Sequence, residues 1–207
     1  MLLDIHVHTA KYSPCSSLDL YDAAIKARAV GLDGICITDH DTDAAKTEAA
    51  RVVRETGLQI FVGMEVQTYE GDLLVFGLPE PPGMIMYAAA LLAKVAAAGG
   101  TAVAAHPFRD NERGLGEYIL QLPGLGGVEV LNGRTTKAGN ARAQALAAKH
   151  KFARLGGSDA HHLEELGRYA TFVPGLVADE KQFIQAVRDK RVRPVNLQQR
   201  NQVKSLP

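Results

Sequence analysis

Short apolar runs that end in polar side chains alternate with helical segments along most of this chain. The runs cover residues 2–8, 34–38, 59–64, 101–105, 127–131 and 153–155. Helical segments of ten or more residues separate most of them, which is the pattern of βα units with parallel strands. Such a chain can fold as an open doubly wound sheet or as a closed βα barrel.

The polar residues at the ends of the runs favour the barrel. They are His6 and His8, Asp39 and His40, Glu65, His106, Asn132, and Asp159 and His161. In a βα barrel the carboxyl ends of the strands converge on one rim, where sites are built. An open sheet would spread six strand ends over too wide a line for all to meet. We therefore predict an α/β fold, a TIM-like barrel, with its site at the C-terminal ends of the strands.

Length and composition indicate one globular domain over residues 1–207. Hydrophobic residues make up 46% of the chain and charged residues 22%, which suits a chain that buries a substantial core. The formal net charge is zero, so a surface built to hold nucleic acid is not favoured, although a short oligonucleotide stays open as a ligand. The sequence does not indicate an oligomeric state.

Cysteine usage and hydropathy predict a cytoplasmic protein with no membrane partner. Cys36 lies in an apolar run and Cys15 in a Ser/Pro loop, so the two cysteines form no disulfide framework. The longest apolar run, residues 83–93, is too short to span a bilayer. The N-terminus has Asp4 and no basic segment, so we see no signal peptide.

Five of the seven histidines lie at the predicted strand ends. His6 and His8 are two residues apart on a strand, so their imidazoles project from one face. With Glu65 and Asp159, the five histidines form a nitrogen and carboxylate set suited to Zn²⁺, Mn²⁺ or Fe²⁺. Seven ligands exceed the need of one ion, and a carboxylate can bridge two. We therefore predict a cluster of two to three divalent ions.

The strand-end residues lie in short motifs. They are His6-Val-His8-Thr, Thr38-Asp-His40-Asp, Glu65 after Val-Gly-Met, Ala105-His106-Pro107 and Gly157-Ser-Asp159-Ala-His161. In this order, and over nearly the whole chain, they resemble the PHP family, named after polymerase and histidinol phosphatase. The resemblance implies a distorted seven-stranded βα barrel, a site of up to three ions (commonly zinc, manganese or iron) and phosphoester hydrolysis.

The resemblance also implies how the ligands divide among the ions. His6, His8, Glu65 and Asp159 would hold one ion. Glu65 would bridge to a second ion that also takes His106. The third ion would take the two remaining histidines, His40 and His161.

Two positions depart from the fullest pattern of the family. The loop after His8 usually supplies another Asp or His, and here it contains Cys15. Cys15 is either a thiolate ligand or an ordinary loop cysteine. Where a further histidine can follow the fifth strand, this chain has Asn132. Its amide could offer a carbonyl oxygen to an ion or only position a water.

The predicted function is hydrolysis of a small phosphorylated metabolite or nucleotide by a metal-activated water. Glu65, Asp159 and His161 are the predicted catalytic residues. Arg134 and Arg168 follow two strand ends and are predicted to bind the substrate, since a planar guanidinium suits a phosphate. A metal-dependent amidohydrolase and a catalytically silent metal-binding regulatory domain are the alternatives.

Overall fold

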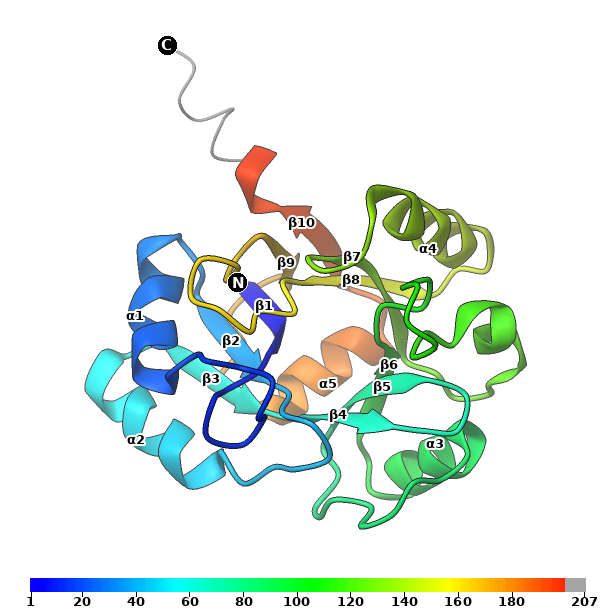
Figure 1. The fold of residues 1–207 in the computed structure, drawn as a ribbon, viewed down its shortest axis with the longest axis horizontal. Helices are drawn as coiled ribbons and strands as arrows, with labels where there is room; N and C mark the ends of the chain where they lie inside the picture. Colours follow the sequence, from blue (N-terminus) through cyan, green and yellow to red (C-terminus); the bar gives the residue numbers. More distant parts are fainter. Residues whose placement is uncertain (200–207) are drawn as a thin grey trace.

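The computed structural model describes residues 1–199, which form two five-stranded sheets covered by five α-helices (Figure 1). The strands are β1 (Leu2–Val7), β2 (Gly34–Ile37), β3 (Gln59–Val62), β4 (Met64–Gln67), β5 (Asp72–Phe76), β6 (Thr101–Ala104), β7 (Gly127–Asn132), β8 (Ala153–Gly157), β9 (Tyr169–Phe172) and β10 (Arg193–Asn196). The helices are α1 (Leu20–Ala29), α2 (Lys46–Thr56), α3 (Ala88–Ala97), α4 (Lys137–Lys149), α5 (Glu180–Arg188) and a 3₁₀ turn, η1 (Gly116–Gln121).

Both sheets mix parallel and antiparallel strands. The first has the order β10-β9-β1-β2-β3 and the second β4-β5-β6-β7-β8. Parallel pairing joins β1 to β2 and β2 to β3 in the first sheet, and β6 to β7 and β7 to β8 in the second. Antiparallel pairing adds β9 and β10 to one sheet and β4 and β5 to the other.

The prediction of a closed seven-stranded TIM-like barrel is wrong. Residues 1–199 form two mixed sheets rather than one closed ring of parallel strands. The chain crosses from the first sheet to the second at Gly63, where a Cβ would lie 2.5 Å from the carbonyl oxygen of Val75 and 2.7 Å from the ring of Phe76. The hairpin of β4 and β5, which turns at Gly71, then reverses the chain direction without a helix. The sequence predicts this hairpin, with a turn at Glu70-Gly71, but a βα pattern does not encode the change of sheet.

The two sheets nevertheless meet at the edge where the predicted ligands lie. Val7 of the first sheet forms a bridge with Ala160, which follows β8 of the second. His40, which follows β2, forms a second bridge with Glu65 in β4. The amide of His8 also donates to the Ala160 carbonyl at 3.0 Å. These two junctions bring strand ends from both sheets to one place.

The apolar core forms three layers. Helices α1 and α2 cover the outer face of the first sheet, and α3 and α4 cover that of the second (Figure 1). Between the sheets, α5 contributes Phe183, which is fully buried. The Phe183 ring lies 5.9 Å from that of Phe61 in the first sheet and 5.1 Å from that of Phe76 in the second. Phe183 therefore packs the two sheets against one helix.

Several element boundaries differ from those expected. The sequence pattern predicts a helix over residues 84–98, but α3 begins at Ala88, because Met86 bridges Thr68 in extended conformation. The pattern predicts a helix over residues 140–150, but α4 begins three residues earlier, at Lys137. The Thr136 hydroxyl caps it by accepting a bond from the Gly139 amide. Strand β10 was not expected. Residues 200–207 lie outside the described part of the chain.

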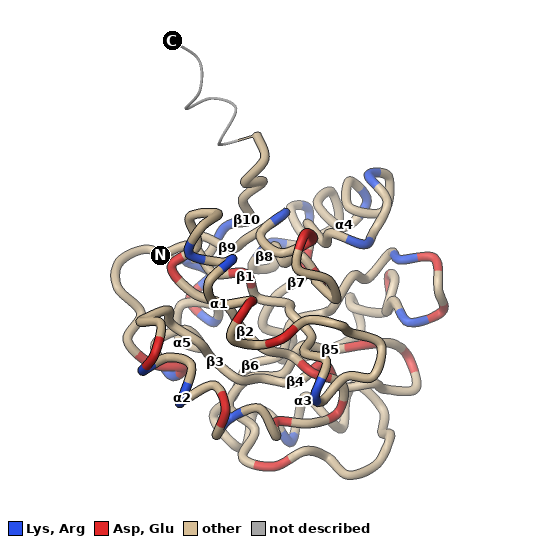
Figure 2. Tube along the Cα trace, turned by 60° about the vertical axis from the view of Figure 1, so that its left-hand side comes forward, with Lys and Arg blue, Asp and Glu red and all other residues tan. Residues whose placement is uncertain are grey.

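The surface carries charges of both signs. Basic and acidic residues are interspersed along the loops and helices of the described residues (Figure 2). None of the helices described is both long and apolar enough to cross a membrane.

Candidate metal centre

All seven predicted ligands come together where the two sheets meet. Their ligand atoms form overlapping groups within 4.8 Å: His6, His8 and Glu65; His6, His106 and Asp159; and His8, His40 and His161. Glu65 comes from β4 and His6 from β1, and the others follow the ends of β1, β2, β6 and β8. Local strand geometry places each side chain, and the junction of the sheets assembles them.

His6 in β1 and His8 directly after it form the most buried part of the cluster. Both are fully buried, and their Nε2 atoms are 3.0 Å apart. The Asp159 Oδ1 atom lies 3.7 Å from His6 Nε2 and 3.5 Å from His8 Nε2. His6 and His8 therefore share a face as the strand pattern predicts, with a carboxylate opposite them.

Glu65 lies at the centre of the cluster. Its Oε1 atom is 2.7 Å from His106 Nε2. Its Oε2 atom is 3.0 Å from His40 Nδ1, 3.3 Å from His8 Nε2 and 3.5 Å from His6 Nε2. One carboxylate thus faces four imidazoles from three segments of chain, which is the position a bridging ligand requires.

His40 and His161, the two most exposed histidines of the cluster, form its mouth. Their side chains are 30% exposed at His40 and 10% at His161, whereas those of His6, His8 and His106 are almost fully covered. The rings of His40 and His161 lie 4.5 Å and 4.4 Å from that of His8. A ligand from solvent would enter on this side.

Burial and charge shift the ionisation of the cluster. Burial acts to raise the pKa of Glu65, but the charge of His6 and bonds from His106 and His40 hold that pKa well below its ordinary value. Burial likewise opposes ionisation of Asp159, whose pKa is held low by His6 and His8. Burial and the charge of His8 lower the pKa of His161 to about 4. Both carboxylates are therefore anionic and His161 is neutral at pH 7.

Two cluster residues adopt left-handed backbone conformations that side chains rarely take. The φ angle is 28° at His106 and 55° at Asp159. Each such residue costs about 1–3 kcal/mol and persists only where its surroundings impose it. The His106 amide is fixed by a 2.9 Å bond to Glu129, and Asp159 Oδ2 accepts a 3.1 Å bond from Asn132. The fold thus stores strain where it aims these two side chains.

The donor set fits divalent metal ions. Neutral imidazole nitrogens and ionised carboxylates are the ligands that Zn²⁺, Mn²⁺ and Fe²⁺ take in proteins. Here imidazoles and carboxylates face one another at close range, and the Nε2 atoms of the buried His6 and His8 are 3.0 Å apart. The groups of three could each hold an ion. Which residues bind metal stays a prediction.

Comparison with known proteins gives the family. A family model described as PHP-associated matches residues 137–192. An uncharacterized protein of Methanocaldococcus jannaschii is 31% identical over 142 residues, which are 64% of this chain and 82% of that protein. The chain belongs to the PHP family. The resemblance seen in the sequence motifs is therefore confirmed.

Solved structures share the fold of this PHP chain over most of its length. A protein of Bifidobacterium adolescentis, for which a metal-dependent phosphoesterase activity has been suggested, has a TM-score of 0.69 and 21% identity, covering 89% of this chain and 96% of its own. An amidohydrolase of Chromobacterium violaceum, with sulfate and no metal bound, has a TM-score of 0.67 and 17% identity, covering 94% and 98%. A lesion-specific endonuclease of Pyrococcus furiosus has a TM-score of 0.69 and 18% identity, covering 91% of this chain and 56% of the endonuclease. At these identities the likeness concerns the fold.

Glu129 is a buried residue of the PHP site that the sequence motifs did not identify. Its Oε1 atom lies 3.1 Å from His6 Nδ1, and its Oε2 atom accepts bonds of 2.9 Å from the His106 amide and from Asn132 Nδ2. Such a carboxylate fixes the ring and tautomer of a histidine that binds metal through its other nitrogen. An acidic residue inside the apolar run 127–131 was the available signal.

Asn132 holds other residues of the site in place. Its side-chain nitrogen donates to Glu129 and Asp159 at 2.9 Å and 3.1 Å. Its oxygen accepts from three donors, Arg109 Nη2, Arg134 N and Thr135 Oγ1, at 2.8, 3.0 and 3.0 Å. The oxygen is thus fully engaged within the chain. Cys15 is exposed and lies outside the candidate groups of the described residues.

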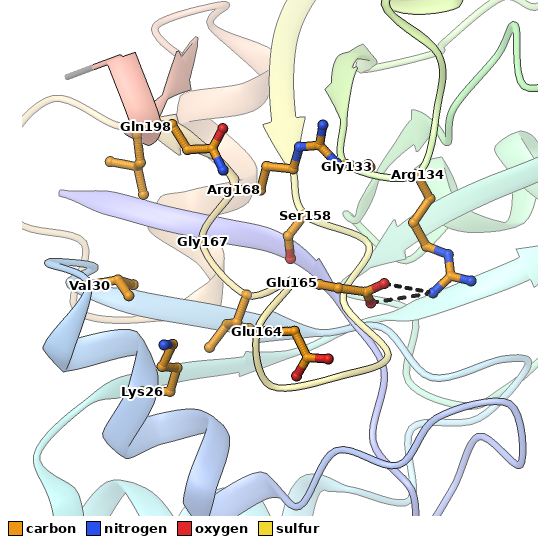
Figure 3. Close-up of a pocket in the computed structure, with 12 residues that line it drawn as sticks. Lys26, Val30, Gly133, Arg134, Ser158, Glu164, Glu165, Gly167, Arg168 and Gln198 are labelled. Atoms are coloured by element: carbon orange, nitrogen blue, oxygen red, sulfur yellow. Dashed lines mark hydrogen bonds and ion pairs between the residues drawn. The ribbon is translucent and has the colours of Figure 1, made fainter. Parts of the chain in front are cut away.

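Arg134 and Arg168 both line a pocket of about 350 Å³ beside the cluster (Figure 3). The pocket also contains Ser158, the residue before Asp159. Arg134 Nη1 lies 3.3 Å from both carboxylate oxygens of Glu165, and Arg168 Nη1 donates to the Gly133 carbonyl at 2.9 Å. The two predicted substrate residues therefore share one wall outside the cluster.

Two more charged residues lie at the cluster, although no sequence motif indicates them. Asp72 of β5 is 1% exposed and forms a candidate group with Glu65 and His106. Its carboxylate accepts hydrogen bonds from Arg113 Nε at 2.6 Å and from Arg113 Nη2 at 3.0 Å. Arg109, three residues after His106, forms an ion pair with Asp159.

Proposed function

We propose that this PHP protein is a metal-dependent phosphoesterase that hydrolyses a small phosphorylated metabolite or nucleotide. The observation that carries the proposal is the convergence of five imidazoles and two carboxylates on one buried cluster with a partly open mouth. Arginines stand beside this cluster. Cations next to a cationic metal cluster make sense when an anionic substrate lies between them.

The proposed cofactor is two to three zinc, manganese or iron ions. His6, His8, Glu65 and Asp159 would hold the first, Glu65 and His106 the second, and His40 and His161 the third. The second and third ions have fewer protein ligands, since the Asn132 oxygen is engaged and Cys15 is exposed. We therefore expect one tightly held ion and weaker binding of the others, with phosphate strengthening the third.

Bound divalent ions would supply an activated water and neutralise the phosphoryl oxygens. Glu65 would hold two ions at a fixed separation, because both of its oxygens face histidines. Neutral His161 would hold its ion at the mouth, where the substrate enters. Asp159 would help to hold the first ion and could accept a hydrogen bond from a water there.

Arg134 and Arg168 are proposed to bind the part of the substrate that extends beyond the reacting phosphoryl group. They line the neighbouring pocket, and Ser158 and Gly133 connect its wall to Asp159 and Asn132 along the chain. A second anionic or polar group of the substrate would replace Glu165 as the partner of Arg134.

A metal-dependent amidohydrolase is the second candidate. It is favoured by one structural neighbour, the Chromobacterium violaceum amidohydrolase, which covers 94% of this chain. The same cluster could activate water against a carbonyl carbon. A silent metal-binding domain is disfavoured because most of the ligand set is present and solvent reaches its mouth.

A substrate screen on metal-loaded protein tests these functions. Phosphomonoesters, phosphodiesters, short oligonucleotides and amides should be compared before and after chelation. We expect phosphoester turnover that disappears with the metal and returns on adding zinc, manganese or iron. Amide turnover alone, or full phosphoester turnover by protein verified as metal-free, would refute the proposal.

A further inference from the structure

Arg109 is the arginine whose guanidinium reaches a predicted metal ligand. Its Nη2 atom forms an ion pair with Asp159 Oδ2 and donates to Asn132 Oδ1 at 2.8 Å. Arg134 and Arg168 are the substrate residues predicted from sequence, but their guanidiniums are engaged by Glu165 and by the Gly133 carbonyl. Arg109 thus stands closer to the reacting centre.

The loop that carries Arg109 is anchored at both ends. The Arg109 amide donates to the His106 carbonyl at 2.9 Å, and the Gly116 amide donates to that of Pro107 at 2.8 Å. Farther along, Arg113 grips Asp72 through two nitrogen atoms, at 2.6 Å and 3.0 Å. A side chain that starts from such a closed loop is presented in one geometry, as positioning of a substrate requires.

The backbone of the loop also packs closely against its own start and against the β4–β5 turn. A Cβ on Gly114 would lie 2.5 Å from the Pro107 carbonyl oxygen. A Cβ on Gly71, in the β4–β5 turn, would lie 2.7 Å from the Leu115 amide nitrogen. The backbone of the loop therefore contacts itself and the hairpin that carries Glu65 and Asp72 on its two strands.

The Arg109 guanidinium retains donors that the protein does not use. Its Nε atom is buried and has no hydrogen-bond partner within the described residues. An unpaired buried donor is costly, so an acceptor is expected there. The side chain is also 17% exposed, which leaves it in reach of a ligand that enters the cluster. Because Nη2 already donates to Asp159 and Asn132, the donors left for the oxygens of a phosphate are Nε and Nη1.

We propose that Arg109 binds the non-bridging oxygens of the substrate's phosphoryl group while Asp159 and Asn132 hold the guanidinium in place. The inference rests on the phosphoesterase function proposed above. Phosphoryl transfer spreads negative charge over these oxygens, and a fixed guanidinium stabilises that charge. Arg134 and Arg168 then bind the remainder of the substrate, so the two sets of arginines have different tasks.

The test compares the full-length, metal-loaded protein with Arg109→Lys and Arg109→Gln. Arg51→Gln is the matched control, since Arg51 lies on the exposed face of α2 and pairs with Glu55. Metal content, thermal unfolding, the affinity for inorganic phosphate by calorimetry, and kcat and KM for p-nitrophenyl phosphate are measured for each. The Lys variant keeps the charge without the planar guanidinium, so it remains informative even where the Gln variant folds poorly.

We expect both Arg109 variants to retain their metal and to bind phosphate about 10-fold to 100-fold more weakly, because a charge-assisted hydrogen bond is lost. The loss should be smaller for Lys than for Gln and absent for Arg51→Gln. Unchanged phosphate affinity in an active protein overturns the inference alone. Loss of metal with normal phosphate binding per remaining site makes Arg109 only a counter-ion of Asp159. Wild-type protein that neither binds phosphate nor turns over phosphoesters overturns the proposed function as well.

Discussion

Replacing Glu129 by Gln should weaken metal binding through the tautomer of a histidine that the substitution does not touch. Glu129 is fully buried, and its Oε2 atom accepts two bonds, from the His106 amide and from Asn132 Nδ2, each at 2.9 Å. A glutamine must turn its carbonyl oxygen toward these two donors. Its amide nitrogen then faces His6 Nδ1, which lies 3.1 Å from the other carboxylate oxygen in the native protein.

An amide nitrogen opposite Nδ1 forces His6 to accept a hydrogen bond there. The single proton of the neutral ring then moves to Nε2. This is the nitrogen that faces His8, Glu65 and Asp159, so a protonated Nε2 cannot bind the first ion. Loss of the partner that orients a metal-binding histidine typically weakens metal affinity by about 10-fold to 100-fold, or roughly 1.4–2.7 kcal/mol. The volume of the side chain is unchanged, so the fold should be retained.

Metal titration by calorimetry measures the affinity, and ¹⁵N chemical shifts of the His6 ring, recorded at a pH where the ring is neutral, report its tautomer in the metal-free protein. Glu117→Gln is the matched control, because its carboxylate is 66% exposed and pairs with Arg142 on the surface. The control should bind metal as the wild type does. A Glu129→Gln protein with native affinity and with its proton on Nδ1 would refute the reasoning.

Three further perturbations test the site and the core. Glu65→Gln should lower metal content more than His40→Ala, because a neutral amide is a poor bridge; equal metal content in both would remove Glu65 from the centre. Alanine at Arg134 or Arg168 should raise KM or lower kcat without changing metal content, and loss of metal would contradict their role with the substrate. Phe183→Ala should lower the free energy of unfolding by about 3–5 kcal/mol in urea, since the ring is fully buried between both sheets; a change below about 1 kcal/mol would contradict that packing.

The convergence of the seven predicted ligands could be inferred from sequence because local geometry places each side chain. His6 and His8 share a face whatever the sheet around them does, since alternation along a strand is a property of the strand itself. The motif at Asp159 and His161 likewise follows the end of its strand. The strand ends come together without a closed barrel, because the bridges at Val7 and His40 join the two sheets at this edge.

The two mixed sheets could not be predicted, because whether strands close into a barrel depends on backbone events that carry little sequence pattern. A βα alternation counts strands and helices, but it does not say that β9 joins β1 antiparallel to it. Nor does it say that the chain changes sheets at a glycine. The need for glycine at position 63 becomes clear only when Val75 and Phe76 are known to lie against it. Convergence of strand ends is therefore weak evidence for a closed barrel, because two mixed sheets also bring the ends together.

Residues that act on the ligands were hidden for a different reason. Glu129 lies 123 positions from His6, so its partner cannot be read from spacing, although a carboxylate within a buried strand signals that some partner exists. Arg109 gives no such signal, since an arginine in a loop is ordinarily solvated. Its importance comes from a closed loop and from Asn132, which holds Arg109, Glu129 and Asp159 together. A buried amide whose donors and acceptors are all engaged, such as Asn132, thus identifies neighbouring residues of the site that no motif contains.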